Sequence, residues 1–158
     1  MGWINDLRGQ VVGLDTAPLI AFIEKQPANV EILRPFFHSV QKYEITVVTS
    51  TVTLLEVLVH PIRHGDVKLT QQYYDILLDS PSFTTVDLNP EIAEEAARLR
   101  AFHKIRTPDS IQLATAIQMN ATYFLTNDLN LPSLPELKIL TLDELKTRPE
   151  YLQPDNSQ

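Results

Sequence analysis

The hydrophobic pattern of this chain alternates between short apolar runs and longer stretches with helical spacing. The short runs are rich in β-branched residues, which is typical of buried strands. They predict five strands, at residues 10–15, 44–49, 83–87, 122–126 and 137–140. Between them, apolar residues recur every three to four positions, which predicts helices. These helices are expected at residues 16–24, 28–42, 51–60, 67–78, 90–102 and 107–119, with a final turn at 142–145.

Prolines indicate where several of these helices begin and end. Pro18 falls in a first turn, where its missing N–H is harmless. Pro35 is expected to kink or restart the helix over 28–42, and Pro61 to end the helix over 51–60. The helix over 51–60 is apolar on nearly every side, so the pattern predicts that it is buried.

Strands that alternate with helices predict a parallel sheet covered by helices on both faces. We therefore expect an α/β fold, a three-layer α/β/α sandwich with a mostly parallel central sheet. The length of 158 residues is about that of one domain. We expect this domain to span residues 1–146, followed by a polar tail over 147–158.

Composition excludes several classes of chemistry. The chain has no cysteine, which excludes disulfides, thiolate zinc sites and a cysteine nucleophile. Its four glycines form no phosphate-binding loop, and its serines lack the glycine context of a nucleophile elbow. A net charge of −7 argues against a protein that coats DNA through a basic surface. No apolar run approaches the roughly 20 residues that span a bilayer. With no signal-peptide pattern at residues 1–8, we expect a cytoplasmic protein without a membrane partner.

The most informative position is Glu56, the only charged residue between residues 50 and 59. An ionised carboxylate in apolar surroundings is costly unless a partner compensates for its charge. We therefore expect Glu56 to be a buried acid that faces a group requiring negative charge. An arginine partner, or a side chain that reaches water, is the alternative.

Three further acids stand where the predicted fold would bring them towards Glu56. Asp15 ends the first expected strand, Asp128 follows the fourth, and Asp109 lies in the first turn of a helix. Sites in parallel sheets form beyond the carboxyl ends of the strands, so one edge could gather all four acids. Such a ring of oxygen ligands suits a hard divalent cation. Each acid alone could also be a helix cap, a first-turn charge or a turn residue.

Two basic groups could contact a phosphate backbone. The first directly precedes Asp109 and comprises Arg98, Arg100, His103, Lys104 and Arg106. The second follows the helix of Glu56 and comprises Arg63, His64 and Lys68. The alternatives are a helix C-terminus that carries favourable cations for the first group, and a solvated surface for the second.

Four short segments occur in the order and spacing of PIN-domain nucleases, and the chain resembles VapC-like toxin ribonucleases in particular. They are VVGLDTAPLI at 11–20, STVTLLEV at 50–57, TPDSIQLATA at 107–116 and FLTND at 124–128. The resemblance implies a PIN-like α/β/α sandwich with Mg²⁺- or Mn²⁺-dependent endoribonuclease activity on RNA. It also implies the toxin of a toxin–antitoxin pair, with an antitoxin protein as a further expected partner. Trp3 and apolar positions on the early helices could contact such a partner or a second copy of the chain in a homodimer, with core packing as the alternative.

The resemblance also assigns the catalytic and metal-binding residues. The four acids of the family match Asp15, Glu56, Asp109 and Asp128, and a hydroxyl residue that often precedes the last acid by two matches Thr126. One segment departs from the pattern, because Ser110, Ile111 and Gln112 stand where relatives more often carry alanine and an aliphatic pair. None of these departures removes an acid.

Two other functions compete with a ribonuclease. A PIN-like scaffold could bind RNA or protein without cutting, but retention of all four acids favours the enzyme. A phosphatase with Asp15 as nucleophile would need a second carboxylate two residues later, where Ala17 stands.

Overall fold

The structure is a computed structural model that describes residues 2–147. Five strands form one sheet: β1 (Val11–Leu14), β2 (Thr46–Ser50), β3 (Phe83–Val86), β4 (Tyr123–Thr126) and β5 (Lys138–Thr141). Their order is β3-β2-β1-β4-β5, and each neighbouring pair is parallel. All five expected strands are therefore confirmed, with β1 at the centre of the sheet.

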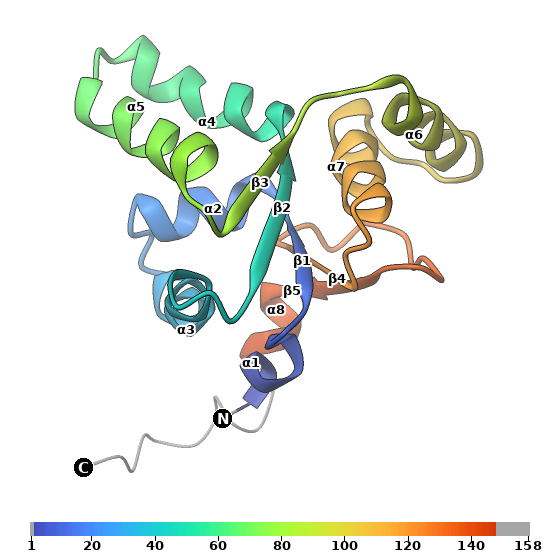
Figure 1. The fold of residues 1–158 in the computed structure, drawn as a ribbon, viewed down its shortest axis with the longest axis horizontal. Helices are drawn as coiled ribbons and strands as arrows, with labels where there is room; N and C mark the ends of the chain where they lie inside the picture. Colours follow the sequence, from blue (N-terminus) through green and yellow to red (C-terminus); the bar gives the residue numbers. More distant parts are fainter. Residues whose placement is uncertain (1, 148–158) are drawn as a thin grey trace.

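Helices cover both faces of the sheet, as expected. They are α1 (Gly2–Leu7), α2 (Thr16–Ile23), α3 (Val30–Gln41), α4 (Thr51–Arg63), α5 (Val67–Tyr74), α6 (Pro90–Phe102), α7 (Thr107–Gln118) and α8 (Leu142–Lys146), with a π-helical turn η1 (Asp75–Asp79) after α5. Figure 1 shows α6 and α7 on one side of the sheet, α2 and α3 on the other, and α4 beside α5. No helix within residues 2–147 is long and apolar enough to cross a membrane. The expected tail lies, apart from Thr147, outside the described residues.

The alternation of side chains along the strands builds two apolar layers. Val47 belongs to the layer that also holds α1, α2 and α3, whereas its neighbour Val48 belongs to the layer under α6 and α7. In the first layer Trp3 is buried and stacks on Phe36, with the two ring centroids 6.1 Å apart. These layers hold the sheet rigidly between the helices that carry the candidate site.

Gly13 in β1 sets how closely α7 approaches the sheet. A Cβ atom at this position would lie 2.7 Å from Ala116 Cβ and 2.8 Å from Phe124 Cδ2. Such distances are far inside van der Waals contact. The absence of a side chain at Gly13 therefore lets α7, whose first turn carries Asp109, pack directly against the strand that leads to Asp15.

Two expectations about the helices are wrong, and both concern α4. Pro61 does not end α4, which continues to Arg63. Pro61 lies in the last turn, so the helix loses one backbone hydrogen bond without breaking. The helix α3 runs through Pro35 without a restart, and the alternative expectation of a kink there stays a prediction.

Nor is α4 buried on every side. It packs Thr53, Val57 and Leu58 inwards, whereas Leu55 is 65% exposed and Val59 and Ile62 are also exposed. The reason is that its neighbours α2, α5, α7 and β2 cover only one of its faces. Apolar composition alone does not show whether an element exists to cover each face.

Candidate active site

The four acids predicted from the sequence line one pocket of about 350 Å³. Asp15 follows β1 directly as the N-cap of α2, and Asp128 lies two residues after the end of β4. Because β1 and β4 are adjacent and parallel, their carboxyl ends place these two acids side by side. Glu56 reaches the pocket from α4, and Asp109 from the first turn of α7.

Asp15 is the most firmly held of these carboxylates. Its Oδ1 accepts the backbone N–H of Thr16 at 2.8 Å, and its Oδ2 accepts the hydroxyl of Thr126 at 2.7 Å. The Thr126 oxygen in turn accepts the backbone N–H of Asp128 at 3.0 Å. The fully buried Thr126 therefore connects Asp15 to the backbone of the next acid.

Glu56 is exposed, which corrects the expectation that it is a buried acid. It lies on the side of α4 that borders the pocket, and its Oε1 accepts the hydroxyl of Thr16 at 3.2 Å. The side chain therefore reaches water and the other acids at once. Solvent access lowers the cost of its charge but does not remove it, because partial burial still raises its pKa.

Asp109 is the acid with a basic partner. Its carboxylate forms an ion pair with Arg106, with Arg106 Nε 3.1 Å from Asp109 Oδ2. The side chain of Asp109 is only 15% exposed, whereas that of Arg106 is 79% exposed. Arg106 therefore lines the pocket with a guanidinium group that is exposed to solvent.

Burial and mutual repulsion make the pocket unfavourable for several negative charges. Burial raises the pKa of Asp15 above its ordinary value, and the charges of Asp109 and Asp128 raise it further, against the lowering effect of the hydrogen bonds from Thr126 and Thr16. The pKa of Glu56 is also raised, mainly by desolvation and then by Asp15 and Asp109. A bound cation would relieve this repulsion.

The donor atoms of the pocket fit a hard divalent cation. Besides the four carboxylates, Asn127 lines the pocket, and its buried Oδ1 has no hydrogen-bond partner. Within residues 2–147, no three acidic or histidine side chains already form a compact metal cluster. Mg²⁺ does not require one, because it retains several waters and binds through one or two carboxylates plus substrate oxygens.

Sequence reasoning missed a buried polar network directly below the acids. It consists of Thr16, Thr49, Thr53 and Gln112, which come from α2, β2, α4 and α7. Thr53 Oγ1 lies 3.1 Å from Thr16 Oγ1 and 2.9 Å from Thr49 Oγ1. No local signal in the sequence marks this network, because its four residues come from four different elements.

The predicted basic group does not act as one surface. Among its five residues, which all fall in the described part of the chain, only Arg106 lines the acidic pocket. Arg98 pairs with Glu94 and Glu95 on its own helix, and Arg100 donates to Ile105 O and to the hydroxyl of Thr107. His103 and Lys104 lie in the segment between α6 and α7.

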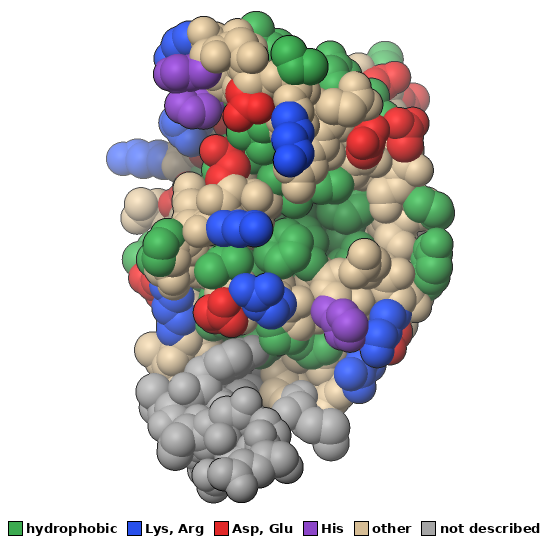
Figure 2. All heavy atoms as spheres, turned by 90° about the vertical axis from the view of Figure 1, so that its left-hand side faces the viewer, with side chains coloured by type: hydrophobic (Ala, Val, Ile, Leu, Met, Phe, Trp, Pro, Cys, Tyr) green, Lys and Arg blue, Asp and Glu red, His purple; other side chains and the backbone are tan. Residues whose placement is uncertain are grey.

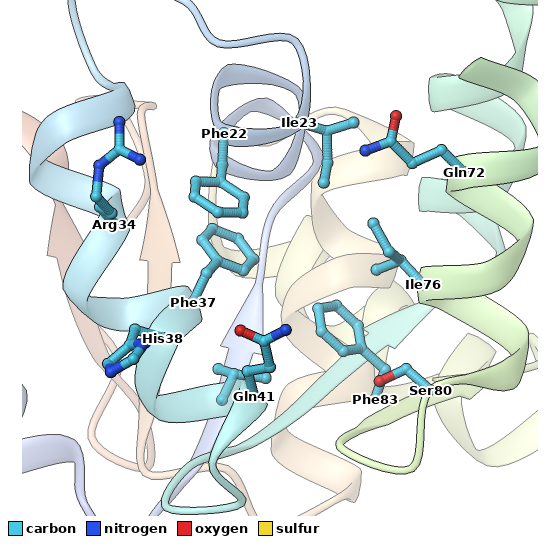
Figure 3. Close-up of a pocket in the computed structure, with 11 residues that line it drawn as sticks. Phe22, Ile23, Arg34, Phe37, His38, Gln41, Gln72, Ile76, Ser80 and Phe83 are labelled. Carbon is cyan, nitrogen blue, oxygen red and sulfur yellow. The ribbon is translucent and has the colours of Figure 1, made fainter. Parts of the chain in front are cut away.

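A second, larger pocket of about 560 Å³ is apolar and shares no lining residue with the acidic one. Figure 2 shows it as a hollow of apolar side chains framed by polar and basic ones. In Figure 3, Phe22 and Phe37 stack, with ring centroids 4.2 Å apart, and Ile76 and Phe83 line the opposite side. Its surface offers contact to apolar groups and contains no acid.

Comparison with known proteins identifies the family. The sequence profile of the PIN domain matches residues 12–137, which is most of the chain and includes all four acids. The chain belongs to the PIN domain family. The resemblance inferred from the four sequence segments is therefore confirmed. No curated protein sequence matches the chain significantly.

Solved structures that are similar to this PIN domain agree with the observed fold. VapBC2 from Rickettsia felis, bound to a DNA fragment from its promoter, is 21% identical, with a TM-score of 0.59 over 83% of this chain and 98% of that chain. A toxin–antitoxin complex from Klebsiella pneumoniae is 22% identical, with a TM-score of 0.61 over 84% and 97%. FitAcB from Neisseria gonorrhoeae is 18% identical, with a TM-score of 0.62 over 84% and 97%. At these identities, the likeness shows a shared fold.

Proposed function

We propose that this PIN domain is a Mg²⁺- or Mn²⁺-dependent endoribonuclease that hydrolyses RNA phosphodiester bonds in the cytoplasm. The observation that carries the proposal is the convergence of Asp15, Glu56, Asp109 and Asp128 on one pocket from four separate segments. Burial first, and then the neighbouring carboxylates, raise the pKa of Asp15 and that of Glu56, and a bound cation would offset both effects.

The four acids and Thr126 would have different roles at the ion. Asp15 and Asp109 would hold the principal ion, and Asp128 would complete the site when substrate arrives. When bound, the ion stabilises the negative charge on the phosphate and makes water a better nucleophile. Glu56, which has access to solvent, would bind the ion directly or through water and would orient the attacking water. Thr126 would keep Asp15 in place through its hydrogen bond.

Cleavage of a fluorescently labelled single-stranded RNA in the presence of Mn²⁺ tests this function. Wild-type protein should cut the RNA, and chelation of the metal should stop it. Asp15→Asn should lower the rate by at least about a hundredfold, because an amide is a poor ligand for the ion and carries no charge. Asp79→Asn makes the same substitution at an exposed position outside the pocket and should cut RNA at the wild-type rate, which makes it the matched control. A contaminating nuclease would give equal rates in all three preparations.

The outcomes separate the enzyme from a scaffold. Equal rates for wild type and Asp15→Asn would remove the proposed mechanism. RNA binding without cleavage in any divalent metal would instead favour a catalytically silent PIN domain that acts as a scaffold. That the buried Asn127 Oδ1 lacks a partner favours the metal-dependent enzyme, since a cation or its water would supply one.

We further propose that the chain is a toxin inhibited by a separately encoded antitoxin. Support comes from the similar structures, which include toxin–antitoxin complexes. The apolar pocket of Figure 3 is a surface on which an apolar segment of such a partner could pack, apart from the acids. A partner that occupies a concave apolar surface gains most of its binding energy there.

Growth assays test the toxin proposal separately from the nuclease. Expression of the wild-type chain should arrest bacterial growth, that of Asp15→Asn should not, and co-expression of the proposed antitoxin should restore growth. Gln72→Trp, at the exposed rim of the apolar pocket, should weaken this rescue, whereas Gln71→Trp, which does not line that pocket, should retain it. Unaffected growth would end the toxin proposal and leave the nuclease proposal to the cleavage assay.

The expected homodimer stays a prediction. Leu55, Val59 and Ile62 form an exposed apolar stripe on α4 at helical spacing, beside Glu56. A second subunit would bury such a stripe. Sedimentation of wild type and of Leu55→Glu would decide whether this stripe mediates association.

A further inference from the structure

The segment Ser110–Gln112 departs from the usual pattern of the family, and its last residue, Gln112, lies below the acids. It faces inwards from α7, one turn after Asp109, and only 3% of it is exposed. Its amide nitrogen is within hydrogen-bond distance of Thr53 Oγ1, and 3.5 Å from Thr16 Oγ1. One side chain thereby connects α7 to both α2 and α4, the helices that follow Asp15 and carry Glu56.

An ionised Glu56 can only accept, which fixes the hydrogen bond nearest to it. The Thr49 hydroxyl has one hydrogen, which it donates to Leu14 O at 3.0 Å or to Thr53 Oγ1 at 2.9 Å, and Thr53 Oγ1 lies 3.1 Å from Thr16 Oγ1. The Thr16 hydroxyl has a single hydrogen, which it donates to Glu56 Oε1. The two hydrogens of the Gln112 amide then point to Thr53 and Thr16, which both accept.

Packing alone does not explain an amide at this position. Gln112 Oε1 is buried and has no hydrogen-bond partner, which is unfavourable inside a protein. An aliphatic side chain of similar size would fill the same space without this cost. The amide N–H groups, which orient two buried hydroxyls, are therefore what distinguishes glutamine from such a residue.

We propose that Gln112 is a positioning residue for Glu56 and acts through the hydroxyl of Thr16. Gln112 contacts the Thr16 oxygen directly and also through Thr53, so that the Thr16 hydroxyl keeps its hydrogen directed at Glu56 and holds that exposed carboxylate over the pocket. The inference rests on the proposed function, in which Glu56 serves the metal and the attacking water. Hydrogen bonds of this kind fix the direction of a carboxylate that would otherwise rotate freely in solvent.

The test compares variants that remove one member of the chain of hydrogen bonds at a time. Gln112→Met removes the amide at nearly constant volume, and Thr16→Val removes the hydroxyl. Each should weaken Mn²⁺ binding, measured by calorimetry, or slow RNA cleavage at saturating substrate by about ten- to a hundredfold, with little change in KM. The double variant should lose no more than either single one, because both break the same connection. Thr16→Ser should retain wild-type values, and Gln118→Met, exposed on the same helix, is the matched control.

Folding is monitored by thermal unfolding, and crystals of Gln112→Met should show the carboxylate of Glu56 turned away from Thr16. Additive losses in the double variant, or wild-type Mn²⁺ binding and cleavage in Gln112→Met, would overturn the inference. Wild-type protein that binds Mn²⁺ but does not cut RNA would refute the proposed function, while the titrations would still decide the role of Gln112. A wild type that binds no Mn²⁺ would overturn both.

Discussion

The hydroxyl of Thr126 donates a hydrogen bond to Asp15 Oδ2 at 2.7 Å, although 111 positions separate the two residues in the sequence. The same oxygen accepts the backbone N–H of Asp128 at 3.0 Å. One buried side chain at the end of β4 therefore fixes the acid after β1 and the start of the turn that carries the last acid. This arrangement depends on the adjacency of β1 and β4 in the sheet.

Replacing Thr126 by valine should impair the site more than the fold. The variant keeps the shape of the side chain but leaves Asp15 Oδ2 and the N–H of Asp128 without their partner. We expect a loss of about ten- to a hundredfold in Mn²⁺ affinity or cleavage rate. The free energy of unfolding should fall by about 1–3 kcal/mol, the usual cost of unpaired buried groups. Thr126→Ser keeps the hydroxyl and should behave like wild type, so a valine variant with full cleavage would contradict this role.

The metal-free protein should become more stable when Asp15 loses its charge. Its folded-state pKa is raised, so between the ordinary value of 3.8 and the higher folded value the folded state binds more protons than the unfolded one. Stability therefore falls as pH rises through this window, and ionised Asp15 destabilises the fold at neutral pH. Asp15→Asn should raise the metal-free Tm at pH 7, by about 2–4 °C for each kcal/mol recovered.

With Mn²⁺ bound, wild type should instead melt at a higher temperature than Asp15→Asn. Binding to the folded wild type stabilises it by about 2.7 kcal/mol at a metal concentration a hundred times the Kd. Asp15→Asn should gain much less, and Asp79→Asn should follow wild type with and without metal. A metal-free Asp15→Asn protein that melts below wild type would show that the hydrogen bonds to Asp15 outweigh its desolvation.

The strands were predictable because their sequences carry the cause of their burial. Val47 and Val48 face opposite apolar layers, and a parallel strand covered on both faces must therefore be apolar at consecutive positions. The proximity of Asp15 and Asp128 was predictable because adjacent parallel strands place the residues that follow them at one edge of the sheet. Helix α1 was missed, because its six residues are too few to establish a helical period.

The exposure of α4 and the polar network were not predictable from the sequence. Leu55 looks like a core residue in the pattern, but it is exposed because no element within residues 2–147 covers that face of α4. Gln112 and Thr16 are 96 positions apart, so their contact depends on how α7 and α2 pack. A local pattern contains no information about such pairs.

Gly13→Ala should destabilise the protein through the packing of α7. The added methyl group would meet Ala116 Cβ and the ring of Phe124 below 3 Å, so the helix or the ring must move. We expect a loss of about 1–3 kcal/mol in the free energy of unfolding, as for other overpacked cores. Adding Ala116→Gly should recover part of it, because it removes one of the two clashing groups. Chemical denaturation measures the free energy of unfolding of the single and the double variant. Unchanged stability in Gly13→Ala would show that α7 is not held at its close distance from β1.

Arg106 should contribute to RNA binding, and Arg98 should not. Arg106 lines the acidic pocket with an exposed guanidinium group, whereas Arg98 is engaged by Glu94 and Glu95 on α6. Binding of labelled RNA is measured by anisotropy at about 50–200 mM salt, in the Asp15→Asn background to prevent cleavage. If Arg106 contacts one phosphate, Arg106→Gln should weaken binding and reduce the slope of log K against log salt by about 0.7. Arg98→Gln should leave the affinity and the slope unchanged. A protein that lacks a phosphate contact releases fewer counterions when it binds RNA, so an unaltered slope in Arg106→Gln would exclude such a contact for Arg106.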